Sequence, residues 1–170
     1  SSTYVGYEAG VAATGGSNTF IGAIAGQSNT SGIQNTAVGA QALQKNTTAS
    51  NNVAVGFQAL EENITGKQNI AMGNSALDDN TTGSYNVAIG QSAIGSNTTA
   101  SYNVAIEYQP VLRNTNGKRN IGMGSFSLEQ TTTVRNNVAI AYSERDNDTT
   151  SVNITAVGNR ASQTCTKGNN

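Results

Sequence analysis

Runs of three apolar residues return along this chain at a constant interval, separated by polar segments. Val53-Ala54-Val55 and Ile70-Ala71-Met72 are two such runs, and each directly follows an asparagine. The interval is 17 residues, since 35−18 and 137−120 both equal 17. Asparagine occupies this position at Asn18, Asn35, Asn52, Asn69, Asn86, Asn103, Asn120 and Asn137. A fixed short period predicts one small unit stacked on copies of itself.

Each repeat divides into segments with different local preferences. The β-branched apolar run predicts a strand of about five residues. A second apolar pair, such as Ala59-Leu60, follows a glycine and is too short for a helix, which predicts a second short strand. Polar segments such as Asn80-Thr81-Thr82-Gly83 predict the turns that close the coil.

The constant period and the lack of helical segments predict the architecture. Like strands then stack in parallel, coil upon coil, in an all-β parallel β-solenoid or β-roll. With 170 residues there are 170/17 = 10 coils, and a rung spacing of ~4.8 Å predicts a rod ~48 Å long. We expect one repeat domain over 1–170, with a degenerate coil at 1–17 and irregular coils at 141–170. The first coil lacks an initiating Met, so we expect a processed product or a fragment of a longer fibre.

The apolar runs have two dry faces, because successive strand residues point to opposite sides. We assign the flanking Val, Ile and Met residues to the interior of the coil and the small central residues to a face that another chain approaches. This predicts an oligomer around an axis; the alternative is a monomer in which the small residues pack under the chain's own second strand. The expected interface residues are Ala37, Ala54, Ala71, Ala88, Ala105 and Ala139, with Gly122 in the same row.

The repeated asparagine has two possible roles. Identical amide side chains at the rung spacing can satisfy one another's donors and acceptors, which predicts a ladder inside the coil. The alternative is a row of surface amides that contact glycans. The expected ladder residues are Asn35, Asn52, Asn69, Asn86, Asn103 and Asn120.

The strings Val53-Ala54-Val55-Gly56-Phe57-Gln58-Ala59-Leu60 and Val87-Ala88-Ile89-Gly90-Gln91-Ser92-Ala93-Ile94 resemble the head repeats of trimeric autotransporter adhesins and related repeats of phage and viral tail fibres. The resemblance implies a left-handed parallel β-roll wound as a homotrimer. It covers the central coils well and the terminal coils loosely. The familiar head repeat is shorter, and the extra residues here fall in the N-T-T-G turn, a form associated with the fibres.

Composition limits the partners and the chemistry. The net charge is −1, and no basic stripe with interleaved aromatic residues is evident, so we expect no nucleic-acid partner. No segment is long and apolar enough to span a membrane. The acidic pairs Glu61-Glu62 and Asp78-Asp79 stack at a separation suited to glycoside cleavage. However, histidine is absent and the same positions hold mixed residues elsewhere, so we expect no enzyme, no cofactor and no metal site.

The repeat breaks where Glu107 replaces a glycine and Pro110 replaces an alanine. Because aromatic and arginine side chains are enriched at contact surfaces, we expect Tyr108, Tyr142 and Arg145 to bind a surface receptor or glycan. The alternative is sequence drift near an end of the solenoid.

We therefore expect an extracellular fibre or adhesin segment on a cell or virion surface, acting as spacer and attachment module. Two other classes stay open: a monomeric ice- or glycan-binding solenoid, and a polysaccharide-degrading tail-spike fragment. Rows of threonine invite the ice-binding comparison, although adjacent Thr-Thr pairs before Gly or Ala favour a role in turns. N-x-S/T motifs at Asn29, Asn46, Asn63, Asn80, Asn97, Asn147 and Asn153 would be accessible glycan acceptors only if the source is a eukaryote, a eukaryotic virus or an archaeon.

Overall fold

Ten short strands make up the regular structure of the computed structural model, which describes all residues except 111–114, 128–132, 141, 143–151 and 159–170. Each strand has three residues and begins immediately after the repeated asparagine in the regular coils. The strands are β1 Thr3–Val5, β2 Thr19–Ile21, β3 Thr36–Val38, β4 Val53–Val55, β5 Ile70–Met72, β6 Val87–Ile89, β7 Val104–Ile106, β8 Ile121–Met123, β9 Val138–Ile140 and β10 Thr155–Val157.

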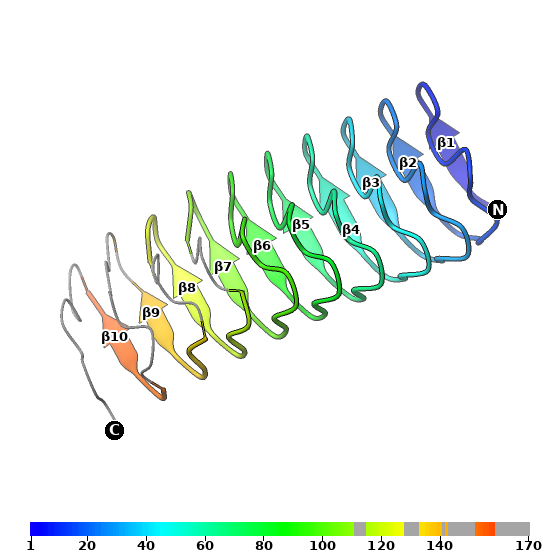
Figure 1. Cartoon of the computed structure of the whole chain (residues 1–170). Coiled ribbons are helices and arrows are strands. Elements are labelled where there is room, and N and C mark those ends of the chain that lie inside the picture. The colour runs from blue at the N-terminus through cyan, green and yellow to red at the C-terminus, as the bar shows by residue number, and fades with distance from the viewer. Residues whose placement is uncertain (111–114, 128–132, 141, 143–151, 159–170) are drawn as a thin grey trace.

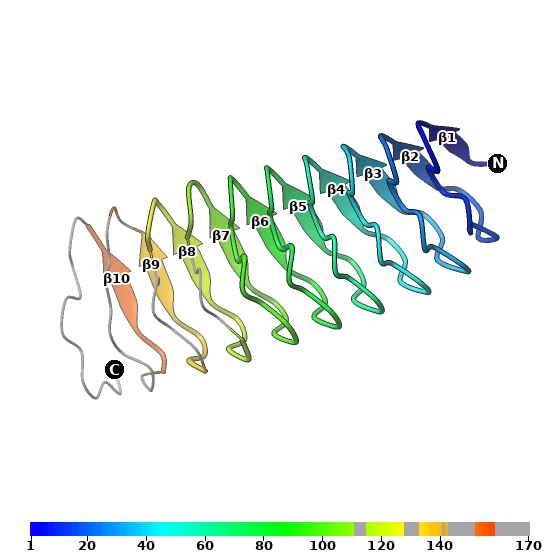
Figure 2. The same ribbon diagram turned by 45° about the horizontal axis from the view of Figure 1, so that its top comes forward.

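All ten strands form a single sheet whose spatial order is the order of the sequence. Neighbouring strands are parallel, and each residue pairs with the residue 17 positions later, as Ala54 does with Ala71. The first step is one residue shorter, because Thr3 pairs with Thr19. Figures 1 and 2 show the strands as successive rungs along a rod, with β1 and β10 at opposite ends. The predicted all-β parallel solenoid is therefore confirmed.

The second strand predicted in each coil is absent from the described residues. Residues 57–62 instead form a run of turns in which successive backbone N–H groups donate either to a carbonyl of the same coil or to a carbonyl of a neighbouring coil. The amide of Glu61 donates to the carbonyl of Gln58 in its own coil, at 3.3 Å, whereas that of Leu60 donates to Ala76 of the next coil, at 3.0 Å. The alternation satisfies the backbone without a strand.

Positive backbone φ angles explain why this segment is not extended. Gln58 has φ 57° and Leu60 has φ 54°, and the equivalent residues of the neighbouring coils repeat these values. Left-handed conformations cost a non-glycine residue roughly 1 kcal/mol or more. The hydrogen bonds between coils and the burial of the Leu60 side chain offset this cost in every repeat.

The core is narrow and is lined by the small residue at the centre of each strand. Ala54, Ala71 and Ala88 are fully buried within the single chain and pack with the leucine of each far turn, such as Leu60. Their side chains therefore point inward, which corrects the expected orientation of the strand. Ala37, Ala105 and Ala139, from the row expected to meet another chain, are buried in the same way, and Gly122 in that row is also buried.

The N-terminal coils fill the same interior with a different pair of residues. Phe20 takes the central strand position of β2, and Gly26 takes the position that leucine holds in later coils. A Cβ atom added to Gly26 would collide with the Phe20 ring. Tyr4 stacks on that ring with centroids 5.3 Å apart. The exchange of an Ala and Leu pair for a Phe and Gly pair conserves core volume, which packing requires.

The predicted asparagine ladder is confirmed, and it runs beside the strands. We call this row the strand ladder; its members are Asn18, Asn35, Asn52, Asn69, Asn86, Asn103, Asn120 and Asn137, all buried. The backbone N–H of Asn69 donates to Oδ1 of Asn52 at 2.9 Å. The Nδ2 of Asn69 donates to the carbonyl of Gly83 at 2.9 Å. The backbone N–H of each ladder asparagine therefore joins its own coil to the preceding coil.

A second buried row of asparagines lies in the turns that close the coils. This turn ladder contains Asn29, Asn46, Asn63, Asn80 and Asn97, each fully buried. The Nδ2 of Asn63 donates to Oδ1 of Asn46 at 3.0 Å and also to the carbonyl of Gly66 at 2.9 Å. Because these side chains are buried and hydrogen-bonded, five of the N-x-S/T motifs are inaccessible to a glycosylating enzyme.

Candidate binding surfaces

The sheet presents a continuous apolar surface to solvent. We call it the outer face; it consists of the first and third residues of every strand, which flank the buried central residue. Met72 is 42% exposed and Ile89 is 36% exposed. The third residues are in register along the whole rod, as in the pairing of Met72 with Ile89 and of Ile89 with Ile106. The predicted column of Val55, Met72, Ile89 and Ile106 therefore exists, but it faces outward.

The length of this face sets it apart from isolated surface hydrophobics. Ten rungs at ~4.8 Å and two residues per rung ~7 Å apart give an apolar strip roughly 48 Å long. Only the first three strands and β10 begin with threonine, so the remainder of the strip is Val, Ile and Met. No charged side chain belongs to any of these strands. Contiguous apolar patches of this extent mark interaction sites.

The edge of the sheet changes at Glu107, which stands where the corners of all preceding coils have glycine. The regular corner glycines have φ angles near 135°, for example 140° at Gly73. A Cβ atom on Gly73 would collide with the backbone oxygen of Gly90 in the next coil. Glu107 keeps a related backbone conformation, φ 99°, and so carries strain that glycine would avoid.

An open groove of about 400 Å³ lies directly beside this strained residue. The carboxylate of Glu107 and the hydroxyl of Ser125 lie 3.5 Å apart in it, and Tyr142, 64% exposed, stands at the wall. Its lining residues are Ile106, Glu107, Met123, Gly124, Ser125, Ile140 and Tyr142. The combination of a carboxylate, a hydroxyl and an aromatic ring over an apolar floor suits a small polar ligand with an apolar face.

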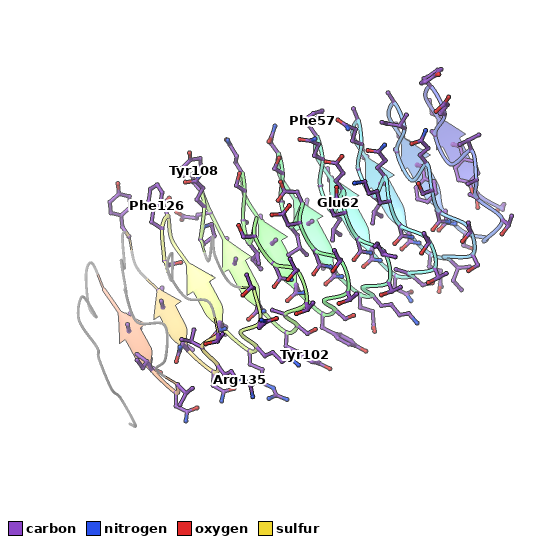
Figure 3. All side chains as sticks on the ribbon, in the orientation of Figure 1. Phe57, Glu62, Tyr102, Tyr108, Phe126 and Arg135 are labelled. Atoms are coloured by element: carbon purple, nitrogen blue, oxygen red, sulfur yellow. The ribbon has the colours of Figure 1, made fainter. Side chains whose placement is uncertain are left out.

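The residues expected to bind a target are only partly brought together. Tyr142 lines the groove, whereas Tyr108 packs edge to face on Phe126, with centroids 5.6 Å apart, and is not part of the lining. Figure 3 shows Tyr108 and Phe126 on the same edge of the rod as Phe57. Arg145 lies outside the described residues. Sequence reasoning noted Glu107 as a break without proposing it for binding, although a non-glycine residue at a corner was the available signal.

The acidic pairs form a titrating patch on the segment that follows β4 and β5. Burial, together with the charge of Asp79, raises the pKa of Asp78 to about 6. Burial is also the main cause that raises the pKa of Glu61. Glu62 pairs instead with Lys45 at 2.5 Å. A carboxyl group with a pKa of about 6 can exchange protons near neutrality, but the chain contains no histidine to act with it.

The threonines expected in the turns do serve the backbone. The hydroxyls of Thr47 and Thr81 donate to the carbonyls of Ile64 and Thr98 in the next coil, at 3.1 and 2.9 Å. These contacts are local to the turns, as side-chain capping predicts.

In the described part of the chain, no group of three His, Cys, Asp or Glu side chains is placed to hold a metal ion. The same residues include no helix with the length and hydropathy needed to cross a bilayer.

Comparisons of the chain with protein-family models, with curated proteins and with solved structures found no match.

Proposed function

We propose that this chain is a spacer and attachment segment of a homotrimeric fibre on a cell or virion surface. The observation that supports self-association is the outer face, an uncharged apolar strip along the whole sheet. Association that buries this strip would gain roughly 25 cal/mol of free energy for each Å² of apolar surface removed from water.

A copy of the same chain is the partner that fits this face best. A partner must match side chains at every rung over about 48 Å, and a second solenoid has the same spacing by construction. The face repeats Val, Ile and Met without charge, so identical surfaces can meet without desolvating an ion. The number three comes from the resemblance to adhesin heads and tail fibres.

Attachment is assigned to the irregular coils rather than to the regular ones. Regular coils present the same polar rows repeatedly, which offers little to distinguish one target from another. The groove beside Glu107 and Tyr142 breaks that uniformity. Its floor of Ile106, Met123 and Ile140 belongs to the outer face, so attachment is assigned to the border of the groove, at Glu107, Ser125 and Tyr142, beside the self-association surface. We include Tyr108 and Arg145 in the same attachment region, with a surface receptor or glycan as the target.

Sedimentation equilibrium tests the self-association directly. A trimer has a mass of 3 × 17.4 = 52.2 kDa, against 17.4 kDa for the monomer. We expect the trimer for the native chain and the monomer for the double variant Met72→Glu and Ile89→Glu, which places charge on the outer face. A matched control, Thr65→Glu and Thr82→Glu, adds the same charge to exposed turns of the neighbouring coils.

The control variant should keep the mass of the native chain, and circular dichroism should show the same β-rich spectrum for all three proteins. A native chain that sediments as a monomer at every concentration refutes the proposed trimer and favours a monomeric solenoid. The variants Tyr108→Ala, Tyr142→Ala and Arg145→Ala test attachment to the target surface. If they keep the mass of the native chain and bind the target as strongly as it does, the irregular coils are not the attachment site.

A further inference from the structure

The charged side chains of the described residues are divided between the two long sides of the sheet, where the chain leaves each strand and where it enters each strand. We call these two sides the edges of the sheet. The six described carboxylates all lie on the segment that follows a strand, at Glu8, Glu61, Glu62, Asp78, Asp79 and Glu107. Four of the five described cations lie on the segment that precedes a strand, at Lys67, Lys118, Arg119 and Arg135. We call this second segment the basic edge. The division exists although the whole chain has a net charge of only −1.

Two tyrosines and an arginine form a column on the basic edge. The rings of Tyr85 and Tyr102 are stacked with centroids 4.8 Å apart and planes 2° from parallel. The guanidinium of Arg119, from the next coil, lies over the Tyr102 ring at 5.8 Å from its centroid. Figure 3 shows Tyr102 and Arg135 on the edge of the rod opposite to Phe57 and Tyr108.

The backbone holds this column in place. Tyr85, Tyr102 and Arg119 each have φ between 57° and 64°, the left-handed conformation that every coil adopts just before the strand ladder. Their amides donate to carbonyls of the preceding coil, at 3.0 Å for Tyr85 and 3.1 Å for Tyr102. The side chains are therefore displayed at the rung spacing on a fixed support, which lowers the entropy lost on binding.

The cations of the basic edge are available to an external anion. Lys118, Arg119 and Arg135 are exposed, and within the described ranges the ion pair observed is on the opposite edge, between Lys45 and Glu62. Tyr102 is 50% exposed although its ring is in contact with Tyr85 and Arg119. Its free surface is thus the ring edge with the hydroxyl, which donates a hydrogen bond to an anion.

These observations favour one class of partner over two others. A nucleic acid would stack its bases on open aromatic faces, whereas here Tyr85 and Arg119 lie over the Tyr102 ring and Tyr102 covers one face of Tyr85. A second copy of the chain aligned in register would not pair these charges. Its acidic pairs lie in the coils of β4 and β5, whereas three of the four cations lie at residues 118–135. A linear polymer with spaced anionic groups can follow the edge and meet successive guanidinium, ammonium and hydroxyl groups.

We propose that the basic edge binds an acidic polysaccharide, through carboxylate or sulfate groups held by Lys118, Arg119 and Arg135 and by the hydroxyls of Tyr85 and Tyr102. This is a second recognition site, beyond the groove proposed for attachment, and it is independent of self-association. It also places recognition on a different edge from the groove beside Glu107.

The test measures binding of the native chain to four polymers by biolayer interferometry. The probes are polygalacturonate, dextran sulfate, neutral dextran and a single-stranded oligothymidylate, each at low and at physiological ionic strength. We expect binding of one or both acidic polysaccharides, weaker at higher ionic strength, and none of neutral dextran. Preference between polygalacturonate and dextran sulfate then distinguishes carboxylate from sulfate as the recognised group.

Variants of the basic edge provide the second part of the test. The double variant Lys118→Gln and Arg119→Gln should weaken binding about tenfold at low ionic strength and reduce the salt slope by about 2. Tyr102→Phe keeps the ring stack and should give a smaller loss of about two- to fivefold, because one hydroxyl donor disappears. Lys45→Gln is the matched control on the opposite edge and should bind as the native chain does.

Three results would overturn the proposal. One is the absence of binding to both acidic polysaccharides at low ionic strength; another is a loss in Lys45→Gln equal to that in the double variant. The third is tighter binding of oligothymidylate than of either polysaccharide, which would assign the edge to nucleic acid. Sedimentation of the same samples keeps this result separate from the proposed trimer, since either can fail alone.

Discussion

The regular coils of residues 35–103 and the altered coils of residues 104–142 share one side of the solenoid and differ on the other. On the sheet side nothing changes: β7, β8 and β9 pair in the same register as β4 and β5. The strand ladder also continues, since the amide of Asn120 donates to Asn103 at 3.0 Å and that of Asn137 to Asn120 at 3.1 Å.

The far side of the coil changes in the same stretch. Glu107 replaces the corner glycine, Pro110 replaces an alanine, and Ser127 stands buried at a position where earlier coils have alanine. The groove lies where the corner residues Glu107 and Ser125 adjoin the outer face of β7, β8 and β9. The comparison indicates that the strand ladder and the sheet support one side of the rod independently of the far turns. A solenoid can therefore alter one side to build a pocket without interrupting the stack.

The largest expected effect comes from a corner in the regular coils. Gly73→Ala should destabilise the fold by about 4 kcal/mol or more, because the new Cβ collides with a backbone oxygen and φ is 140°. The matched control is Gly158→Ala, at an equivalent corner with φ 119° but with no atom of the described residues within 4 Å of the new Cβ. Thermal unfolding by circular dichroism measures both. Equal costs would mean that backbone strain, not the stacking of coils, makes the corner glycine necessary.

The next effect concerns the strand ladder. Asn69→Ala removes one of the two donors to the Gly83 carbonyl, which keeps the Nδ2 of Asn80, and removes the acceptor of the buried Asn86 N–H, which is left unpaired. We expect a loss of about 3 kcal/mol in the free energy of unfolding. Asn137→Ala, near the end of the rod, should cost less. Urea unfolding of both variants checks the order, and a larger loss at Asn137 would contradict the view that the central ladder holds the coils together.

A smaller effect of opposite sign is expected at the break. Glu107→Gly restores the regular corner and relieves the strain of a positive φ, so it should stabilise the chain by about 1 kcal/mol. That corresponds to a rise of roughly 2–4 °C in Tm for a chain of this size. The same substitution removes the carboxylate from the groove, so attachment should weaken while stability rises. A variant that is less stable than the native chain would show that Glu107 is a structural residue.

The smallest effect is the pH dependence of the acidic patch. Because burial raises the pKa of Asp78 to about 6 in the folded chain, above its unfolded value of about 3.9, folding favours the protonated form. Its contribution to stability is therefore fully present below pH ~4 and is lost as pH rises through about 6. Asp78→Asn should raise Tm by about 2 °C at pH 7 and leave it nearly unchanged at pH 4. An equal shift at both values would rule out titration of Asp78 as the cause.

The repeat period alone was sufficient to predict the parallel stack and its register, because identical units at a constant spacing leave few other arrangements. Residues such as Asn52 and Asn69 were also assigned correctly, since a buried amide must find partners and its copies lie at the rung distance. The shorter first step, from Thr3 to Thr19, followed directly from counting residues.

The orientation of the strand could not be obtained in the same way. Alternation places Ala54 opposite Val53 and Val55, but it does not say which side is the interior. Burial preference favours the larger residues inside, whereas the interior is so narrow that alanine fills it beside Leu60. Likewise, residue preferences disfavour a positive φ at Gln58 and Leu60, so the far turns were predicted as a strand.

The contact between Tyr85, Tyr102 and Arg119 could not be predicted from the sequence, for a different reason. The three residues recur at 17-residue spacing and were visible as a pattern. Their contact required knowing that the residue before each ladder asparagine projects outward, which depends on its left-handed backbone. The segregation of charge between the two edges needed the same knowledge.

The direction of the hydrogen bonds has a mechanical consequence. In a parallel solenoid the bonds between rungs run along the rod, so a tensile force applied at the two ends of one chain loads them one coil after another. Each coil that detaches releases 17 residues, which extend to about 58 Å from a rise of about 5 Å. A single chain pulled by its ends should then lengthen in equal steps of roughly 50 Å, and a fibre of such chains would yield gradually under load and absorb work at each step.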